Sequence, residues 1–234
     1  LMPRVTVNRH WQKFFGHGFV KSAEDFGTQG QKPTHPRLLD WLAVEFMESG
    51  WDVKALHKKI VMSATYRQTA RASAAAHRTD PENRLLARGP RSRLPSWMLR
   101  DQALAVSGLL VRQIGGPSVK PYQPAGVWAE ATFGKKRYAQ DHGDKLYRRS
   151  LYTFWRRIIG PTMFFDVAKR QTCSVKTART NTPLHALVTL NDTTYVEAAR
   201  ALAQRVMQAE SGAEQRITAA FRLCATRRPQ QNEI

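Results

Sequence analysis

Five arginines lie in or near one aromatic stretch of the chain and have the chemistry of an anion-binding site. They are Arg148, Arg149, Arg156, Arg157 and Arg179, around Tyr147, Tyr152, Phe154 and Trp155. Guanidinium groups bind carboxylate, sulfate or phosphate through paired hydrogen bonds, and aromatic rings stack on sugars or bases. The structural alternative is that the arginines pair internally with Asp101, Asp166 and Asp192 while the rings fill the core. The candidate ligand-binding residues are Arg148, Arg149, Arg179, Asn181 and Asp192.

A second candidate site lies in the loop that precedes these arginines. Asp141, His142 and Asp144 place two carboxylates beside an imidazole, a set able to bind a cation or to transfer protons. The same residue types are common in turns for conformational reasons alone. Elsewhere, the histidines and carboxylates of residues 35–57 lack the spacing of metal ligands on a helix, so no metal site is predicted.

Motifs of the common catalytic classes are missing from the sequence. It contains no P-loop, no dinucleotide-binding glycine pattern, no nucleophile elbow and no HExxH motif. Cys173 and Cys224 are too few for a disulfide framework and form no C-x-x-C pair, so no zinc, redox or covalent c-type haem site is predicted within these residues. We expect Cys224 on the apolar face of a helix and Cys173 as a lone thiol, with one disulfide between them left open.

The chain is strongly basic, and the charge is uneven. Its 37 basic and 18 acidic residues give a formal charge of +19, and residues 71–160 alone hold 17 basic and 6 acidic residues. Such a balance indicates an anionic partner, whether nucleic acid, an anionic polysaccharide or lipid, or an acidic neighbouring domain; an arginine-rich solvated surface is the alternative. No apolar run reaches the ~18 residues that a membrane span needs.

The pattern of apolar residues predicts a single, mainly α domain over residues 1–234. Helices are expected at 3–15, 36–49, 53–64 and 96–113, and again over about 183–226. Residues 67–79 are expected to be a mobile connection, and Asp80 is expected to begin a short helix. Residues 115–146 form a basic, proline- and glycine-rich insert, and residues 149–155 are the best candidate for a strand, at most one of a short pair.

One segment near the C-terminus is unusually distinctive. It runs Arg-Thr-Asn-Thr-Pro-Leu-His-Ala-Leu over residues 179–187 and continues with Leu-Asn-Asp over residues 190–192. Pro183 suits the first turn of a helix, with Asn181 and Thr182 before it, and Asp192 suits the cap of the next helix. Helix capping is therefore the leading physical explanation of its polar residues, and Arg179 is the residue that capping explains least.

This segment resembles the signature of a planctomycete family labelled domain of unknown function 1553. Further stretches are similar to the same family, among them Val7-Asn8-Arg9, Phe15 to Val20, Thr34-His35-Pro36, Gly50 to Lys54, Ser63 to Gln68 and Tyr147 to Trp155. The similarity covers about residues 5–229. The chain departs from the expected pattern at His185, where the family has Gln, and at Pro95-Ser96, where an acidic residue is expected.

The resemblance implies architecture more than chemistry. It implies the C-terminal part of a large exported protein, preceded by an upstream domain and often by a c-type cytochrome module, so that any haem belongs outside these residues. Consistent with that, the sequence is expected to be a fragment of a longer chain. The implied location is extracytoplasmic or the cell envelope, and the implied partners are the upstream domain and an anionic polymer or carbohydrate.

Three functional hypotheses follow. The first is a non-catalytic helical module for binding or scaffolding that packs on the upstream domain. The second is half of an active site for an anionic or carbohydrate substrate, with acid–base groups from Asp141, His142 or the neighbour. The third is nucleic-acid or polyanion binding through the basic middle third, which predicts a steep loss of affinity with salt.

Overall fold

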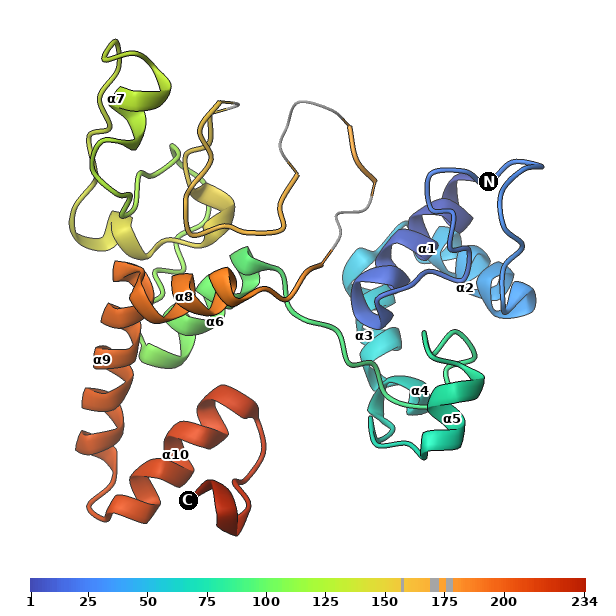
Figure 1. The fold of residues 1–234 in the computed structure, drawn as a ribbon. Coiled ribbons are helices and arrows are strands. Elements are labelled where there is room, and N and C mark those ends of the chain that lie inside the picture. The colour runs from blue at the N-terminus through green and yellow to red at the C-terminus, as the bar shows by residue number, and fades with distance from the viewer. Residues whose placement is uncertain (157, 169–172, 176–178) are drawn as a thin grey trace. The chain divides into compact units, whose positions relative to one another are not determined.

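The computed structural model describes residues 1–156, 158–168, 173–175 and 179–234. The fold is mainly α, as predicted, and in these ranges β-pairing is limited to two isolated bridges, Val111 with Arg148 and Val119 with Thr153. The chain divides into two compact units, an N-terminal unit of Leu1–Arg93 and a C-terminal unit of Leu94–Ile234 (Figure 1). The sequence predicts that residues 1–234 form a single domain, and this stays a prediction.

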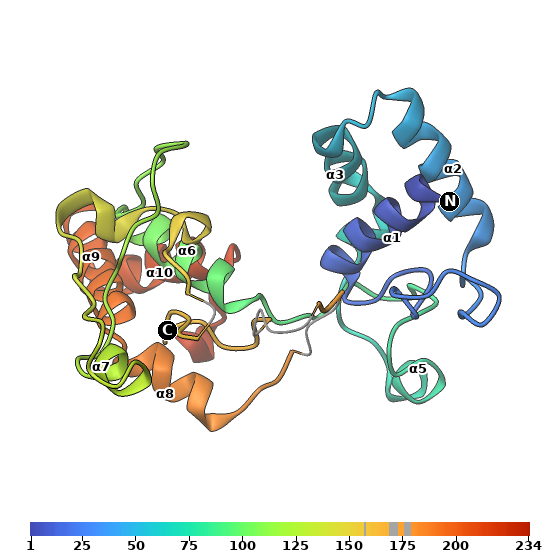
Figure 2. The same cartoon turned by 90° about the horizontal axis from the view of Figure 1, so that it is seen from above.

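The N-terminal unit is a small helical cluster. Its helices are α1 (Met2–Phe15), α2 (Pro36–Glu48), α3 (Val53–Met62), α4 (Ala64–Arg67) and α5 (Ala74–Thr79). Figure 2 shows α1 beside α2 and α3. The apolar faces of these three helices, together with the loop after α1, form one core of Val7, Trp11, Phe15, Phe19, Val20, Leu39, Leu42, Phe46, Leu56 and Ile60. The helical spacing of these residues therefore places them on inward faces, as the sequence indicates.

A buried asparagine fixes the loop that follows α1. Asn8 is completely buried, and its amide donates to the carbonyl of Val20 at 3.0 Å while its Oδ1 accepts from the Val20 amide at 2.9 Å. A Cβ on Gly18 would lie 2.5 Å from both side-chain heteroatoms of Asn8. The loop can close on Asn8 only because residue 18 has no side chain.

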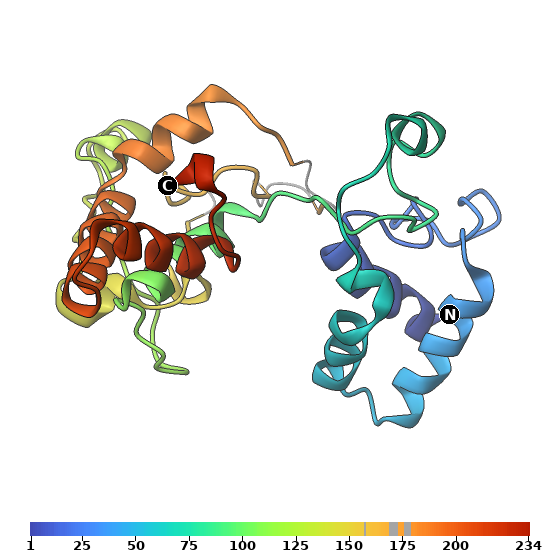
Figure 3. The ribbon, with the colours of Figure 1, turned by 90° about the horizontal axis from the view of Figure 1, so that it is seen from below.

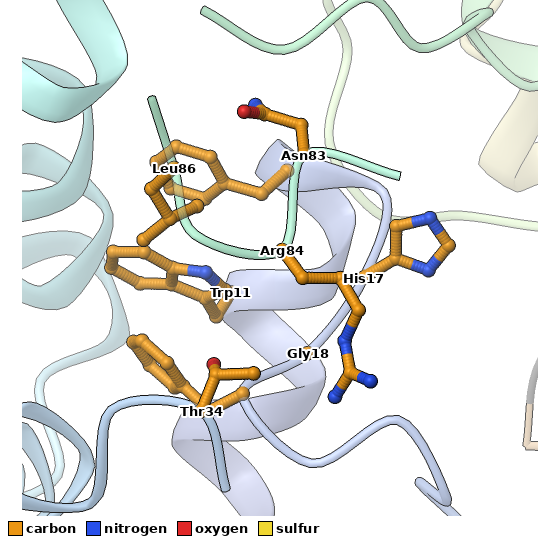
Figure 4. A pocket seen from close by; sticks show the side chains of 9 residues that line it. Trp11, His17, Gly18, Thr34, Asn83, Arg84 and Leu86 are labelled. Carbon is orange, nitrogen blue, oxygen red and sulfur yellow. The ribbon is translucent and has the colours of Figure 1, made fainter. Parts of the chain in front are cut away.

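The hollow beside Trp11 is too small for an organic ligand. Figure 4 shows Trp11 there together with His17, Arg84 and Leu86. Its volume is about 10 Å³, close to the space that one water molecule needs. The N-terminal unit thus has no ligand-sized pocket at this point.

The C-terminal unit combines helices with a long irregular segment. Its elements are α6 (Ser96–Ser107), α7 (Val127–Ala131), the 3₁₀ turns η1 (Gly143–Tyr147) and η2 (Ser150–Tyr152), α8 (Pro183–Asn191), α9 (Thr193–Ala209), α10 (Ala213–Ala225) and η3 (Gln231–Glu233). Helices α6 and α10 pack on α9, and Figure 3 shows α10 folding back beside α9. The three C-terminal helices occupy the region predicted for them, and no helix among the described residues has both the length and the apolarity to cross a bilayer.

A completely buried arginine joins α6 to the irregular segment. Arg100 donates to the carbonyls of Leu146 at 2.7 Å and Arg148 at 2.9 Å, and to Oγ of Ser150 at 3.2 Å. The neighbouring Asp101 accepts from the Ser150 amide at 2.7 Å. Two adjacent charged residues of one helix therefore hold the chain between η1 and η2 in place.

Four local predictions were wrong, each for a physical reason. Of the strand predicted over 149–155 only the isolated bridge at Thr153 forms, because Ser150–Tyr152 make a 3₁₀ turn whose first amide donates to Asp101. The mobile connection at 67–79 contains α5, which Ser73 caps through the Ala76 amide.

The other two errors concern helix ends. Asp80 begins a turn and not a helix, since its two carboxylate oxygens accept from the amides of Arg84 and Leu85. Helix α6 ends at Ser107 and not at Gln113, because Gly108 adopts a left-handed conformation at φ 85°.

Both cysteines are free and exposed, including Cys224, which was expected on an apolar helix face.

Candidate functional site

One hollow of the C-terminal unit has cationic and aromatic walls. Its volume is about 420 Å³, within the range typical of small-molecule sites. The residues that line it are Lys120, Trp128, Lys136, Arg137, Tyr138, Phe154 and Arg156, which we call the basic aromatic pocket. They come from three stretches of chain: the segment around residue 120, α7 with the turn after it, and the segment after η2.

Backbone hydrogen bonds on both sides hold Lys120 at the pocket wall. On one side, the Val119 amide donates to the carbonyl of Tyr152 at 2.8 Å and the Val119 carbonyl accepts from the Phe154 amide at 2.7 Å. On the other side, the Lys120 amide donates to Oδ2 of Asp141 at 2.7 Å, and its carbonyl accepts from the Asp141 amide at 2.9 Å. The position of Lys120 therefore does not depend on a regular sheet.

The aromatic wall is equally fixed. Trp128 is buried in α7, and its indole Nε1 donates to Oε1 of Gln123 at 2.9 Å. The Tyr138 hydroxyl donates to the carbonyl of Pro121 at 2.7 Å, and burial raises the pKa of that phenol above its ordinary value near 10, which keeps it neutral. The Trp128 ring lies 5.5 Å from Tyr138 and 6.0 Å from Phe154, centroid to centroid.

The charges of the pocket have one sign. Lys120, Lys136, Arg137 and Arg156 contribute four cations, and none of the described residues that line the pocket is acidic. The Nζ of Lys120 lies 5.4 Å from the Phe154 ring centroid, and the Arg156 guanidinium lies 5.9 Å from the Trp128 ring centroid. A concave surface with cations alone concentrates anions and raises their rate of association.

Arg148, which the sequence predicts as a ligand-binding residue, binds the backbone of a loop in the structure. Its side chain is buried, and it donates to the carbonyls of Gln113, Gly115 and Pro117 while stacking 3.9 Å from the Tyr152 ring centroid. These bonds use the donors with which a guanidinium would bind a ligand. Its neighbour Arg149 is exposed and lies 4.0 Å from Asp101.

The predicted acid–base residues lie on the loop behind the pocket. Asp141 accepts from the Lys120 amide and forms an ion pair with Lys145 at 3.7 Å, so its carboxylate positions the pocket wall. His142 and Asp144 are exposed at the start of η1. Of the three, Asp141 alone has a described contact with a residue of the pocket.

The remaining predicted residues belong to the segment 179–192. Arg179 and Asn181 are exposed just before α8, and Asp192 caps α9 by accepting from the Thr194 amide at 2.9 Å. Thr182 precedes α8 as its cap residue without a side-chain capping bond. The roles of Arg148, Arg149, Arg179, Asn181, Asp192, Asp141, His142 and Asp144 in ligand binding or catalysis stay predictions.

Asp166 ties this segment to the preceding loop. Its carboxylate accepts from the amide of Thr180 at 2.7 Å and from the Thr180 hydroxyl at 2.6 Å. His185 is buried, stacks on Phe165 with centroids 4.1 Å apart, and has its Nε2 3.9 Å from Oδ1 of Asp166. The residue at which the chain departs from the expected signature thus packs against this connection.

The pocket residues Lys120, Lys136, Arg137, Trp128 and Tyr138 were missed among the candidate residues. The available signal was the basic run at residues 135–137, which follows Trp128 inside the insert of residues 115–146. Charge alone did not single it out, because arginine-rich stretches occur throughout residues 71–160. Phe154 and Arg156 were noticed in the sequence, but as neighbours of Arg148.

The structure thus describes a mainly helical protein whose C-terminal unit has a hollow lined by basic and aromatic side chains. Comparison with family models gives a match over residues 1–234 to a family described as PSD1, protein of unknown function (DUF1553). The chain belongs to this family, as the motifs in the sequence indicate. No curated protein and no solved structure matches it.

Proposed function

We propose that this chain is a non-catalytic binding module and that its C-terminal unit binds an acidic carbohydrate in the basic aromatic pocket. The observation that carries the proposal is the lining itself: four cations and three aromatic rings around one hollow of about 420 Å³, without a carboxylate among the described lining residues. Guanidinium and ammonium groups bind carboxylate or sulfate substituents, while aromatic rings cover the apolar faces of sugar rings.

The arrangement of the rings favours a carbohydrate over a nucleic acid. Single-stranded nucleic acids are bound along grooves in which successive bases stack on separate aromatic platforms. Here Trp128, Tyr138 and Phe154 converge on one hollow, and only about 7% of the Trp128 surface is exposed. An isolated acidic sugar unit matches such a site better than a run of stacked bases.

The binding module is proposed to work within a larger extracytoplasmic protein at the cell envelope, packed on a neighbouring domain of the same polypeptide. Support for a packing surface comes from α8, where Leu184, Leu187 and Leu190 are 69%, 57% and 73% exposed. Their spacing of three residues places them along one side of the helix. Apolar stripes of this kind on a helix are normally covered by a partner.

Calorimetric titration with an oligogalacturonate tests the pocket. The Arg156→Gln and Lys120→Gln variants should each weaken binding about tenfold, because each removes a charged hydrogen-bond donor. Arg200→Gln, which neutralises an exposed arginine on α9 of the same unit, serves as the matched control and should bind like the wild type. Equal affinities in all four proteins would remove the pocket from the proposal.

Two further ligands test the chemical class. A neutral malto-oligosaccharide of similar length should not bind, because it has no acid group for the cations. An oligothymidylate should bind more weakly than the oligogalacturonate at matched ionic strength, and the reverse order would replace the carbohydrate by a nucleic acid.

A further inference from the structure

The turn after α7 exposes an aromatic side chain in an unfavourable backbone conformation. Phe133 is 92% exposed, the most exposed large apolar residue of the described chain, and its φ is 51°. Residues at this position after a helix are usually glycine, because a side chain is strained there. Gly134, with φ 75°, follows immediately and does not relieve residue 133 of that conformation.

The exposure of Phe133 is built into a hydrogen-bonded turn. The Gly134 amide donates to the carbonyl of Ala129 at 2.7 Å, and the Lys135 amide donates to the carbonyl of Thr132 at 3.1 Å. The buried Thr132 closes the turn, because its Oγ1 accepts from the Lys136 amide at 3.0 Å and donates to the carbonyl of Trp128. The backbone thus holds residue 133 outward at a defined place.

Cations directly follow the exposed ring. Lys135, Lys136 and Arg137 are all exposed, and Glu130 is the one acidic residue in the sequence from 126 to 140. Figure 1 shows α7 and its turn at the outer end of the irregular segment, well away from α10 in the same unit. An apolar ring next to a basic run is the arrangement with which peripheral proteins enter the interface of an anionic bilayer.

We infer that this turn, residues 132–137, attaches the C-terminal unit to the surface of an anionic lipid membrane. The Phe133 ring enters the boundary between headgroups and acyl chains, while Lys135, Lys136 and Arg137 pair with lipid phosphates. Charge complementarity selects the anionic surface. Insertion of the ring would explain why an aromatic residue keeps a strained, outward conformation at a position where glycine is favoured. Lys136 and Arg137 also line the basic aromatic pocket, whereas Phe133 and Lys135 do not, so substitutions of these two residues test the attachment apart from the proposed sugar site.

Flotation with vesicles tests the inference on the whole chain. The wild type should float with vesicles that contain about a third phosphatidylglycerol and should stay behind with vesicles of pure phosphatidylcholine. Phe133→Gly should lower binding about tenfold or more through the lost apolar contact. Phe133→Trp should bind at least as well as the wild type, because tryptophan favours the interface. Lys135→Gln should weaken binding about fivefold.

Controls separate a folding defect and the sugar site from membrane attachment. Glycine suits a positive φ, so Phe133→Gly should melt no lower than the wild type while it loses vesicle binding. Met207→Ser, which removes a side chain 55% exposed on α9, should float like the wild type. Phe133→Gly should keep its affinity for oligogalacturonate, so failure of one proposal can be told from failure of the other. Equal flotation of wild type and Phe133→Gly would overturn the inference.

Discussion

The guanidinium of Arg100 donates a hydrogen bond from Nη1 to the backbone carbonyl of Arg148 at 2.9 Å, so one arginine positions the backbone of another. Burial lowers the pKa of Arg100, and Asp101, 3.8 Å from Nη1, offsets part of that effect by favouring the charged form. Arg148 in turn donates to the carbonyls of residues 113, 115 and 117. The two arginines together organise the irregular segment that carries the pocket.

Removing the Arg100 guanidinium should therefore destabilise the C-terminal unit strongly. Arg100→Met keeps much of the side-chain length but leaves the carbonyls of Leu146 and Arg148 and the Ser150 hydroxyl without this donor. A loss of about 3–5 kcal/mol in unfolding free energy is expected from chemical denaturation. Arg112→Met, at an exposed position of the same unit, should change stability by less than about 0.5 kcal/mol. A small effect of Arg100→Met would show that the buried network is not essential.

In the N-terminal unit, the close contact between Asn8 and Gly18, which we call the interlock, should be comparably sensitive to substitution. Gly18→Ala places a Cβ 2.5 Å from the Asn8 amide and should break its two bonds to Val20, at a cost of about 2–4 kcal/mol. Arg9→Ala lies on the exposed side of the same helix and serves as the control. Thermal unfolding measures both, and a Gly18→Ala protein as stable as Arg9→Ala would contradict the interlock.

The sequence predicted the helices best where an apolar face and a cap agree. Pro36 and Asp52 mark the beginnings of α2 and α3, and Pro183 and Asp192 mark those of α8 and α9, since these residues act through the backbone beside them. Residues 149–155 were predicted as a strand because their aromatic and β-branched residues favour extended backbone. The determinants of their actual conformation, Arg100 and Asp101, lie about fifty residues earlier.

Prediction of the candidate site from the sequence was limited in the same way, by contacts between residues that lie far apart in the chain. The sequence indicated that arginines and aromatic rings lie together, and Phe154 and Arg156 do contribute to the basic aromatic pocket. It did not show that Arg148 is buried, because that depends on the backbone carbonyls of a loop some thirty residues away. Nor did it join Lys120 to Phe154, since their contact rests on one isolated bridge next to them.

The stability of the N-terminal unit should fall as the solution becomes acidic. His57 Nε2 and His10 Nδ1 lie 2.8 Å apart, so the hydrogen bond between them requires at least one neutral ring. Burial lowers the pKa of both histidines below the ordinary value of 6.5, and Lys13 lowers them further. The unfolded chain therefore binds more protons than the folded one, and stability present above pH ~6.5 is lost as the pH falls below it.

A variant isolates this pair from other acid-sensitive groups. His57→Phe keeps an aromatic ring beside Phe14 and removes the titration of residue 57. The fall in urea midpoint from pH ~7 to pH ~5 should be smaller in this variant than in the wild type. An identical fall in both proteins would assign the acid sensitivity to other groups.

The connection between Asp166 and Thr180 should control local opening ahead of α8. Asp166 has a φ of 55°, a conformation that Asp and Asn tolerate better than most residues, and its two oxygens accept from the amide and hydroxyl of Thr180. Asp166→Ala should remove both bonds and add backbone strain, so the Thr180 amide should exchange with solvent about tenfold faster. Asp166→Asn retains one acceptor oxygen and the tolerant backbone, and it should show a smaller increase. Hydrogen exchange followed by mass spectrometry compares the three proteins, and equal rates at Thr180 would show that the carboxylate does not hold the segment ahead of α8.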